Sequence, residues 1–520
     1  MAGNQDWILA VDLGTGGPKT AAVSLRGEIL GHETRTVATC YTPGGGATQD
    51  PAAWWEGLRD GVRSLLAAAA ADPASLAGVG ITGQWGSTVP VGSDGRPACD
   101  CLLWADTRGE RFSARAMGGP VSLVGYSPGN LVRWMRITGG APSPHGADPL
   151  GHELQLRELQ PEVFRRTATL LEPLDYLGFR LTGRRAATPA AMILSWLTDN
   201  RPNAKPGYVP GLVRRSGRDP GRLPELLPTG SVLGGLLPEV ADDLGLPAGV
   251  PVVAGVPDLH TAYLGSGAVE PYAAHVTIST TSWISCEVPF KRTDVLHRMA
   301  SVPGLRPGSY LVANNHETAG VCLQWLRDAL GGAGQTPSYE ELCTAAAGVP
   351  VGAGGVLFMP WLNGERTPVE DRNLRGGFLN LSLATGRAEL ARAVLEGVAL
   401  NARWMLDAVE SFIRRPLPSL RILGGGAESD LWCQIHADVL GRPIERVAKP
   451  TQANLRGAAL FAAISLGRLS LDEVPQLVPV DRTFQPDSAA VVAYRSPYRE
   501  FKHLYGRLKG IYARLNRHSP

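Results

Sequence analysis

The sequence lacks the features that would place it in a specialised class of protein. Its 520 residues carry a formal net charge of only +2, so no excess of charge indicates a nucleic-acid or membrane-surface partner. No run of about 18 apolar residues occurs, and no transmembrane helix is expected. The first residues contain neither a basic region nor a long apolar stretch, so no signal peptide is expected. These absences predict a cytoplasmic protein with no membrane and no nucleic-acid partner.

Cysteine is also scarce, and its positions argue against a metal or disulfide framework. The chain has seven cysteines, an odd number, scattered along its length. Cys99 and Cys101 form one close pair, but no second pair with metal-type spacing completes it. We therefore expect free thiols and no zinc site.

What is present is the composition and pattern of a globular α/β protein. Apolar residues make up 44% of the chain and charged residues 19%, and 520 residues are too many for one core. Strand patterns at 7–11, 20–25 and from 29 onward predict a three-stranded meander. A helix predicted over 51–71 and a strand at 79–81 follow, and this alternation indicates an α/β fold with at least two domains.

The second half of the chain partly repeats the first. Strands predicted at 275–278 and 283–288 are joined by a small hydroxylated turn, as the first two strands are joined by a small glycine-rich turn. We interpret this as an internal duplication. The periodicity from 386 to 414 predicts a long helix with Thr385 as its N-cap.

Asp258 lies near the midpoint of the chain, where an apolar strand gives way to a helix rich in small residues. A single carboxylate at a strand end, between two halves of a long chain, suggests a catalytic base in an interdomain cleft. Asp is also a favoured helix N-cap, and a cap alone explains its presence here. The local sequence leaves both interpretations open.

The glycine-rich turn at residues 12–17 is a second candidate site. It is not a P-loop, since Leu13 occupies a position where that motif needs glycine, and it lacks the GxGxxG spacing. Gly14 and Gly16 would let backbone N–H groups approach an anion, and Asp12 could hold a hydrated Mg²⁺. An ordinary β-hairpin turn would use the same residues.

Two further turns could complete such a site. Thr280 and Thr281 in the second hairpin could contact a triphosphate from the other side, although cross-strand threonine pairs are common in hairpins. Gly424, Gly425 and Gly426 lie between a predicted strand and a predicted helix, where backbone can approach a ligand closely. A strained strand-to-helix connection is an equally good explanation of these glycines.

Taken in order, these stretches resemble the FGGY carbohydrate kinases, most nearly their xylulokinase-like branch, over residues 7 to about 470. The resemblance is carried by several landmarks: Asp12-Leu13-Gly14-Thr15 with Lys19, Gln49-Asp50-Pro51, Thr82-Gly83-Gln84, Leu103 to Arg108, Asp175-Tyr176-Leu177, Asp258, Gly364 to Pro368, Arg392 to Gly397, and Gly424 to Ala427.

The resemblance implies two actin-like, ribonuclease H-like domains that flank a deep cleft for ATP and a sugar. We expect an N-terminal domain at 1–256, a C-terminal domain at 257–475 and an extension at 476–520. Asp258 would be the catalytic base and Asp12 would lie near Mg²⁺. The residues expected to bind ATP are Thr15, Gly16, Lys19, Thr280, Thr281, Gly425, Gly426 and Ala427. Those expected to bind the sugar are Gln84, Trp85, Asp106, Arg108, Asp258 and His260.

The activity implied is the ATP- and Mg²⁺-dependent phosphorylation of a hydroxyl of a small sugar, with a xylulose-like ketose as the best single choice. The chain departs from the family pattern at Trp85, where xylulokinases usually carry His, at Leu259, often Asn, and at Thr280, usually Gly. The alternative is a sugar- or nucleotide-binding regulatory protein of the same fold that has lost phosphoryl transfer. A homodimer is compatible with either function.

Overall fold

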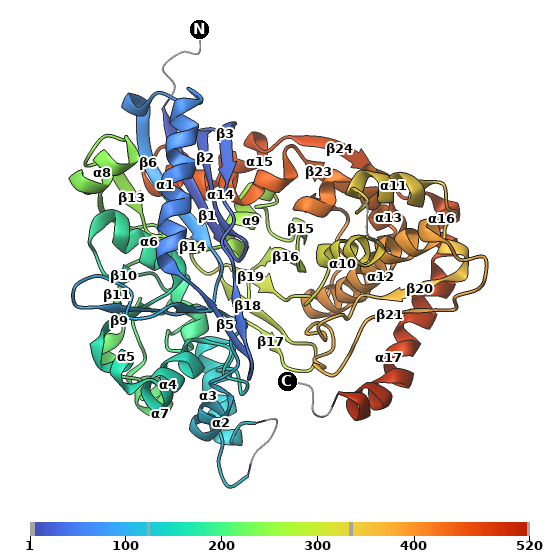
Figure 1. Ribbon diagram of the computed structural model, residues 1–520, viewed down its shortest axis with the longest axis horizontal. Coiled ribbons are helices and arrows are strands. Elements are labelled where there is room, and N and C mark those ends of the chain that lie inside the picture. Colours follow the sequence, from blue (N-terminus) through green and yellow to red (C-terminus); the bar gives the residue numbers. More distant parts are fainter. Residues whose placement is uncertain (1–5, 122–124, 332–335, 517–520) are drawn as a thin grey trace.

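The computed structural model describes residues 6–121, 125–331 and 336–516. These residues form two halves, each built on a β-sheet covered by helices, which lie side by side in Figure 1. Most of the first half runs from blue to green in that view and most of the second from yellow to red. The α/β class predicted from the sequence is confirmed.

The first sheet has seven strands and contains the predicted meander. Its main strand order is β12 (Val232–Gly235), β13 (Pro251–Val253), β6 (Leu76–Gly83), β1 (Trp7–Gly14), β2 (Gly17–Ser24) and β3 (Ile29–Thr34), and β14 (Val256–Pro257) pairs with β6. β2 is antiparallel to both β1 and β3, whereas β6 is parallel to β1 and β13 is parallel to β6. Residues of β1 are buried on both faces, so helices must cover both sides of this sheet.

Alternate residues of β1 enter two different cores. Trp7, Leu9 and Val11 pack with α1 (Pro51–Ala67), whereas Ile8 and Ala10 pack with α9 (Asp258–Ser266) and α14 (Ala453–Ser465). The last helix comes from the second half of the sequence but covers the first sheet, and Figure 1 shows it beside β1. α14 packs closely on β6 because Gly80 of that strand has no side chain: a Cβ there would lie 2.4 Å from the Ala458 carbonyl oxygen.

The second sheet repeats the topology of the first, which confirms the internal duplication. Its eight strands are ordered β17 (Thr293–Asp294), β18 (Met299–Pro303), β19 (Tyr310–Ala313), β16 (Ser282–Val288), β15 (Ala274–Ile278), β22 (Leu420–Leu423), β23 (Ile444–Val447) and β24 (Val480–Phe484). Here β15, β16 and β19 correspond to β1, β2 and β3, while β22 and β23 are the added parallel strands. One face packs on the long helix α12 (Arg387–Ile413), which was predicted over 386–414.

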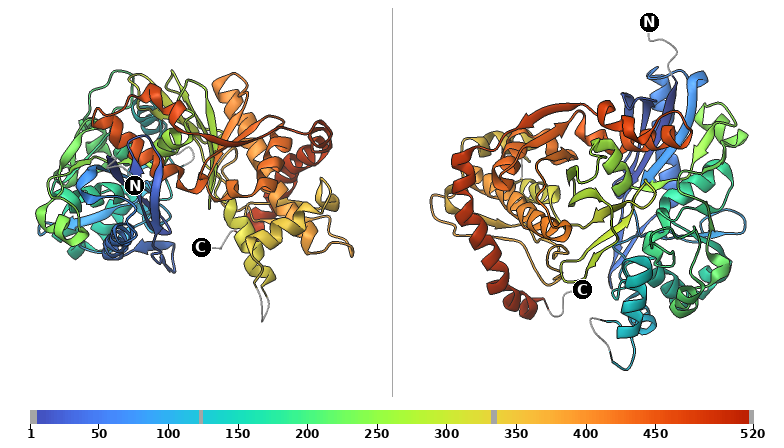
Figure 2. Two further views of the ribbon diagram at one scale, coloured as in Figure 1. Left: turned by 90° about the horizontal axis from the view of Figure 1, so that it is seen from above. Right: turned by 180° about the vertical axis from the view of Figure 1, so that it is seen from behind.

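Two domain boundaries proposed from the sequence can be located on the elements of the structure. The boundary between residues 256 and 257 falls inside β14, immediately before α9. The predicted extension after residue 475 contributes β24 to the second sheet, and α17 (Arg495–Leu515), dark red in Figure 2, runs along the outer edge of the second half. Phe501 of α17 is fully buried, so this segment packs into the second core.

A group of short helices extends the first half along one side of the space between the halves. It comprises α2 (Glu110–Met117), α3 (Pro128–Thr138), α4 (Pro149–Leu159), α7 (Pro210–Ser216) and the short 3₁₀ segment η2 (Ala191–Ser195). Its core includes Met117, Trp134, Leu150 and Leu212. Within the described residues, no helix is both long and apolar enough to cross a membrane.

Candidate active site

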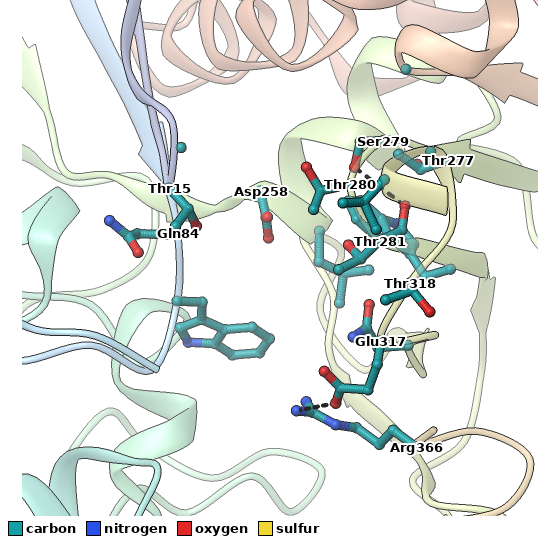
Figure 3. A pocket seen from close by; sticks show the side chains of 18 of the residues that line it. Thr15, Gln84, Asp258, Thr277, Ser279, Thr280, Thr281, Glu317, Thr318 and Arg366 are labelled. Carbon is teal, nitrogen blue, oxygen red and sulfur yellow. Dashed lines mark hydrogen bonds and ion pairs between the residues drawn. The ribbon is translucent and has the colours of Figure 1, made fainter. Parts of the chain in front are cut away.

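A large cavity of about 2370 Å³ lies between the two halves and brings the predicted turns together. It is lined by the β1–β2 turn, the start of α9, the β15–β16 turn and the glycines after β22. Figure 3 shows Thr15 and Gln84 on one side, Ser279 to Thr281 on the other, and Asp258 between them.

Asp258 is positioned by a strand end. β14 pairs with β6 through Val256 and Thr82, and the Thr82 hydroxyl donates a hydrogen bond of 2.8 Å to the Val256 carbonyl. Asp258 is then the first residue of α9, Pro257 is the capping residue, and no side chain in the described part of the chain caps the helix. The alternative interpretation of Asp258 as an N-cap is therefore wrong, because its carboxylate lines the cavity instead.

The surroundings of Asp258 raise the pKa of its carboxyl group. This pKa is raised to about 7, mainly by burial and to a smaller extent by the negative charge of Asp12. The Leu259 N–H and the Lys19 ammonium act in the opposite direction. A carboxylate with a pKa near 7 is well matched to taking a proton at physiological pH.

Asp12 and Lys19 face each other across the first hairpin. They are register partners in β1 and β2, with 3.4 Å between Lys19 Nζ and Asp12 Oδ2, and Asp12 is only 4% exposed. In the described parts of the chain, no three His, Cys, Asp or Glu side chains form a metal-binding group. Mg²⁺ needs only one or two carboxylates because it keeps several waters, so the carboxylate of Asp12 on the cavity wall fits this ion.

The β1–β2 turn presents open backbone to the cavity. Thr15 is held by the Gln49 side-chain amide, which donates to its carbonyl at 2.6 Å, and by the Trp104 indole N–H, 3.3 Å from its hydroxyl oxygen. Gly17 has φ +121°, and a Cβ there would lie 2.3 Å from the Arg35 carbonyl oxygen. A Cβ on Gly16 would meet no atom of the described residues within 4 Å, so this side of the turn is accessible to a ligand.

The backbone of the β15–β16 turn is held by hydrogen bonds from the start of α10 (Gly320–Leu330). The Gly320 N–H donates to the Ser279 carbonyl at 2.7 Å, and the Ala319 N–H donates to the Thr280 carbonyl at 2.9 Å. This leaves the side chains of Thr280 and Thr281 on the cavity wall. The two hairpin turns thus line one cavity, as the hairpin pattern in each half of the sequence suggested.

The glycines after β22 form a third part of the wall. Gly424 has φ +92°, and a Cβ there would lie 2.4 Å from the Ile278 carbonyl oxygen, so only glycine fits. Gly425 is exposed and open, and Gly426 also lines the cavity. Ala427 is fully buried and lies outside the cavity wall, because the short η5 turn (Gly425–Glu428) directs it into the second core.

The predicted sugar residues divide into two groups. Gln84 and Trp85 line the cavity, and the Trp85 indole N–H is fixed by a 3.0 Å hydrogen bond to the Ala191 carbonyl. Asp106, Arg108 and His260 do not line it. Arg108 Nε donates to Asp106 Oδ2 at 3.0 Å, and the buried His260 ring lies 2.9 Å from the Pro303 carbonyl oxygen.

Glu317 and Arg366 lie on the cavity wall but were not among the predicted site residues. Arg366 Nη2 is 2.7 Å from Glu317 Oε1, and Figure 3 shows the pair below the β15–β16 turn. The neighbouring Glu365 is buried instead, accepts a 2.6 Å hydrogen bond from the Asn401 amide, and has a pKa raised by burial to about 8. The only sequence signal for Glu317 was its place in the polar run from Asn314 to Glu317, which lies between β19 and α10.

Comparison with known protein families matches this architecture. The model of the N-terminal domain of the FGGY family of carbohydrate kinases matches residues 7–116, and that of its C-terminal domain matches residues 286–466. Together they span more than half of the chain.

The chain belongs to the FGGY family of carbohydrate kinases.

Relatives of this kinase match over almost its whole length. The xylulose kinase of Staphylococcus epidermidis is 28% identical and the match covers 98% of each chain. The glycerol kinase of Citrifermentans bemidjiense is also 28% identical, with 92% of this chain and 94% of the relative covered. The crystal structure of the xylulose kinase from Rhodospirillum rubrum is similar with a TM-score of 0.80 at 28% identity, covering 97% and 99% of the two chains.

These findings confirm the expected fold, a pair of actin-like domains, and identify the protein as a carbohydrate kinase. Membership of a kinase family implies that ATP is the phosphoryl donor.

Proposed function

We propose that this kinase transfers the γ-phosphoryl group of ATP to a hydroxyl of a small sugar, with a xylulose-like ketose as the acceptor. The observation that carries the proposal is the position of Asp258, a carboxylate with a pKa of about 7 between two hydroxyl-bearing hairpin turns. The relatives named xylulose kinase support a ketose, and the glycerol kinase among the relatives is consistent with a small polyhydroxy acceptor.

The chemistry that these residues can perform is proton removal and positioning. Asp258 accepts the proton of the acceptor hydroxyl as the hydroxyl oxygen forms a bond to the γ-phosphorus and the bond from that phosphorus to the ADP oxygen breaks. The proton then passes from Asp258 to solvent, leaving a sugar phosphate and ADP. Such a transfer requires little covalent assistance beyond alignment and charge stabilisation.

We assign the phosphate groups to the space between the two hairpin turns. Thr15, Gly16 and Lys19 would contact them from the first half, and Thr280 and Thr281 from the second. Mg²⁺, held by Asp12 through its water shell, would neutralise part of the phosphate charge. Gly425 and Gly426 would lie against the adenosine, with the buried Ala427 supporting that turn from behind.

The sugar would lie beside Asp258, against Gln84 and Trp85. Glu317 and Arg366 lie on the opposite wall and supply further polar groups for its hydroxyls. In this proposal the Asp106–Arg108 pair and His260 act indirectly, because they stabilise the backbone behind the wall. The Asp106 carboxylate, for example, accepts a 3.2 Å hydrogen bond from the Ala47 N–H.

A coupled assay of ADP release tests this function directly. The purified protein is incubated with Mg-ATP and a panel of ketoses, aldoses and polyols at neutral pH. We expect a ketopentose to raise ADP release well above the sugar-free rate, and Asp258→Asn to lower that rate by a factor of about 10²–10⁴. If no sugar raises the rate, the proposal is wrong. Sugar binding without turnover would instead favour a regulatory protein of the same fold.

A further inference from the structure

One aromatic residue on the cavity wall has an unusual backbone conformation. Trp196 ends η2 with φ 58° and ψ 27°, in the left-handed region. Bulky side chains rarely adopt this conformation, and residues that do so in spite of the strain are often found at binding sites. Trp196 is half-buried and lines the cavity together with the apolar residues Leu131, Met135 and Leu194.

Three contacts fix the Trp196 ring and backbone. Its indole N–H donates to Asp148 Oδ2 at 3.0 Å, and its carbonyl oxygen accepts a 3.0 Å hydrogen bond from the Trp134 indole. The ring also lies against Gly140, where a Cβ would come within 2.2 Å of a ring carbon. The ring therefore occupies space that is free only because residue 140 is glycine.

The same short segment supports the predicted sugar residues. The Ala191 carbonyl of η2 accepts the Trp85 indole hydrogen bond at 3.0 Å. A Cβ on Gly86 would lie 2.9 Å from Leu194 Cδ1, so η2 packs directly against the Trp85–Gly86 backbone. Trp196 and Trp85 are consequently two parts of one supported wall.

We propose that Trp196 is a substrate-binding residue against which the C–H face of the acceptor's carbon chain packs, and that it selects acceptors by chain length. Aromatic rings provide large apolar contact at low entropic cost, and binding pockets combine such surfaces with a few polar groups. Gly140 and Asp148 are positioning residues that hold the ring. The inference rests on the proposed sugar kinase activity and adds a specificity determinant to it.

The competing explanation is that Trp196 only completes the core of the helical region, against which it also packs. The two explanations predict different kinetics. A core residue would change the thermal stability and affect every acceptor alike. A wall for the acceptor would change KM for longer sugars and leave KM for ATP unchanged.

The test compares Gly140→Ala, Trp196→Phe and Trp196→Leu with a matched control, Gly129→Ala, whose Cβ would meet no atom of the described residues within 4 Å. The acceptors are glycerol, xylulose and fructose, with KM and kcat measured for each and KM measured for ATP. Sugar binding is also measured by calorimetry, so that binding is observed even without turnover.

We expect Gly140→Ala and Trp196→Leu to raise KM for xylulose and fructose about tenfold, with a smaller change for glycerol and kcat within about threefold. Trp196→Phe should lie between them and the wild type, and Gly129→Ala should match the wild type. Equal KM values in all variants, or equal changes for all acceptors and ATP, would overturn the inference.

If Gly140→Ala does not fold, the kinetics of Trp196→Leu alone decide between the two explanations. A wild type that binds the sugars but does not phosphorylate them would contradict the proposed function, while the binding constants would still test Trp196.

Discussion

At the scale of single residues, Asp258 has two properties that matter: it lies on the wall of the central cavity, and the pKa of its carboxyl group is raised. Both follow from the chain around it, since β14 ends at Pro257 and Asp12 lies close enough to repel its charge. The family's chemistry needs a group that accepts a proton at neutral pH, and this carboxylate is suited to that role.

The raised pKa predicts the pH dependence of the reaction. In the proposed mechanism Asp258 acts as a base and must be deprotonated, so kcat/KM for the sugar should rise about tenfold per pH unit below pH 7 and level off above it. Initial rates between pH 5 and 9, at saturating Mg-ATP, give this profile. A rate independent of pH between 5.5 and 8 would contradict the role of Asp258 as base.

The same group predicts a gain of stability when the charge is removed. The pKa of Asp258 is about 7 in the folded protein, against 3.8 for an ordinary exposed Asp, so the unfolded chain loses its proton first and stability falls as pH rises through this window. Asp258→Asn should therefore stabilise the ligand-free protein at pH 8 by about 1–2 kcal/mol, with little difference below pH 4. Urea unfolding at both pH values measures this, and a variant less stable than the wild type at pH 8 would contradict it.

The sequence predicted which residues line the site where the backbone turn alone places them there. It did not predict the direction in which a helical side chain points. The turn residues Thr15, Thr280 and Thr281 line the cavity because each hairpin turn projects from its sheet. His260 was expected in the sugar pocket because it lies two residues after Asp258. A step of two residues along a helix rotates the side-chain direction by roughly 200°, so His260 points into the core.

At the scale of elements, the two hairpins present their turns to the cavity, and the start of α10 holds the second of these turns in place. Both hairpins were predicted from strand patterns, and the long helix α12 from its periodicity. Its N-cap was predicted wrongly: Gly386 occupies that position, and the Thr385 hydroxyl accepts from the Ser382 N–H instead. Such caps depend on the path of the preceding loop, which single residues do not specify.

The support beneath the second turn can be tested at Gly320. A Cβ there would lie 2.4 Å from the Ser279 carbonyl oxygen, so Gly320→Ala should displace the β15–β16 turn and raise KM for ATP about tenfold. KM for the sugar should change much less. Gly211→Ala, whose Cβ would meet nothing within 4 Å among the described residues, is the matched control. Unchanged ATP kinetics in Gly320→Ala would show that this turn does not contact the nucleotide.

The whole molecule is a duplicated pair of sheets with the site between them. The sequence indicated the duplication only weakly, because the two halves share topology more than residues. It could not show that α14 crosses back to cover the first sheet, or that the segment after residue 475 joins the second core, since both depend on long-range packing.

The contribution of the C-terminal segment can be measured at Phe501. Its ring is fully buried, with its centroid 5.3 Å from that of Trp361 and 6.4 Å from that of Trp404. Phe501→Ala should lower the free energy of unfolding by about 3–5 kcal/mol. Leu515→Ala, at a residue 73% exposed on the same helix, should have almost no effect. A loss below about 1 kcal/mol for Phe501→Ala would mean that α17 is dispensable for the second core.

The central claim is that this cavity transfers a phosphoryl group to a sugar with Asp258 as the base. The most direct test follows the label from γ-³²P-ATP into sugar phosphate, for wild type and Asp258→Asn, with sugar and ATP binding measured on the same preparations. We predict labelled sugar phosphate with the wild type, and in the variant a loss of at least about a hundredfold in transfer with both ligands still bound. Transfer at the wild-type rate by Asp258→Asn would contradict the claim.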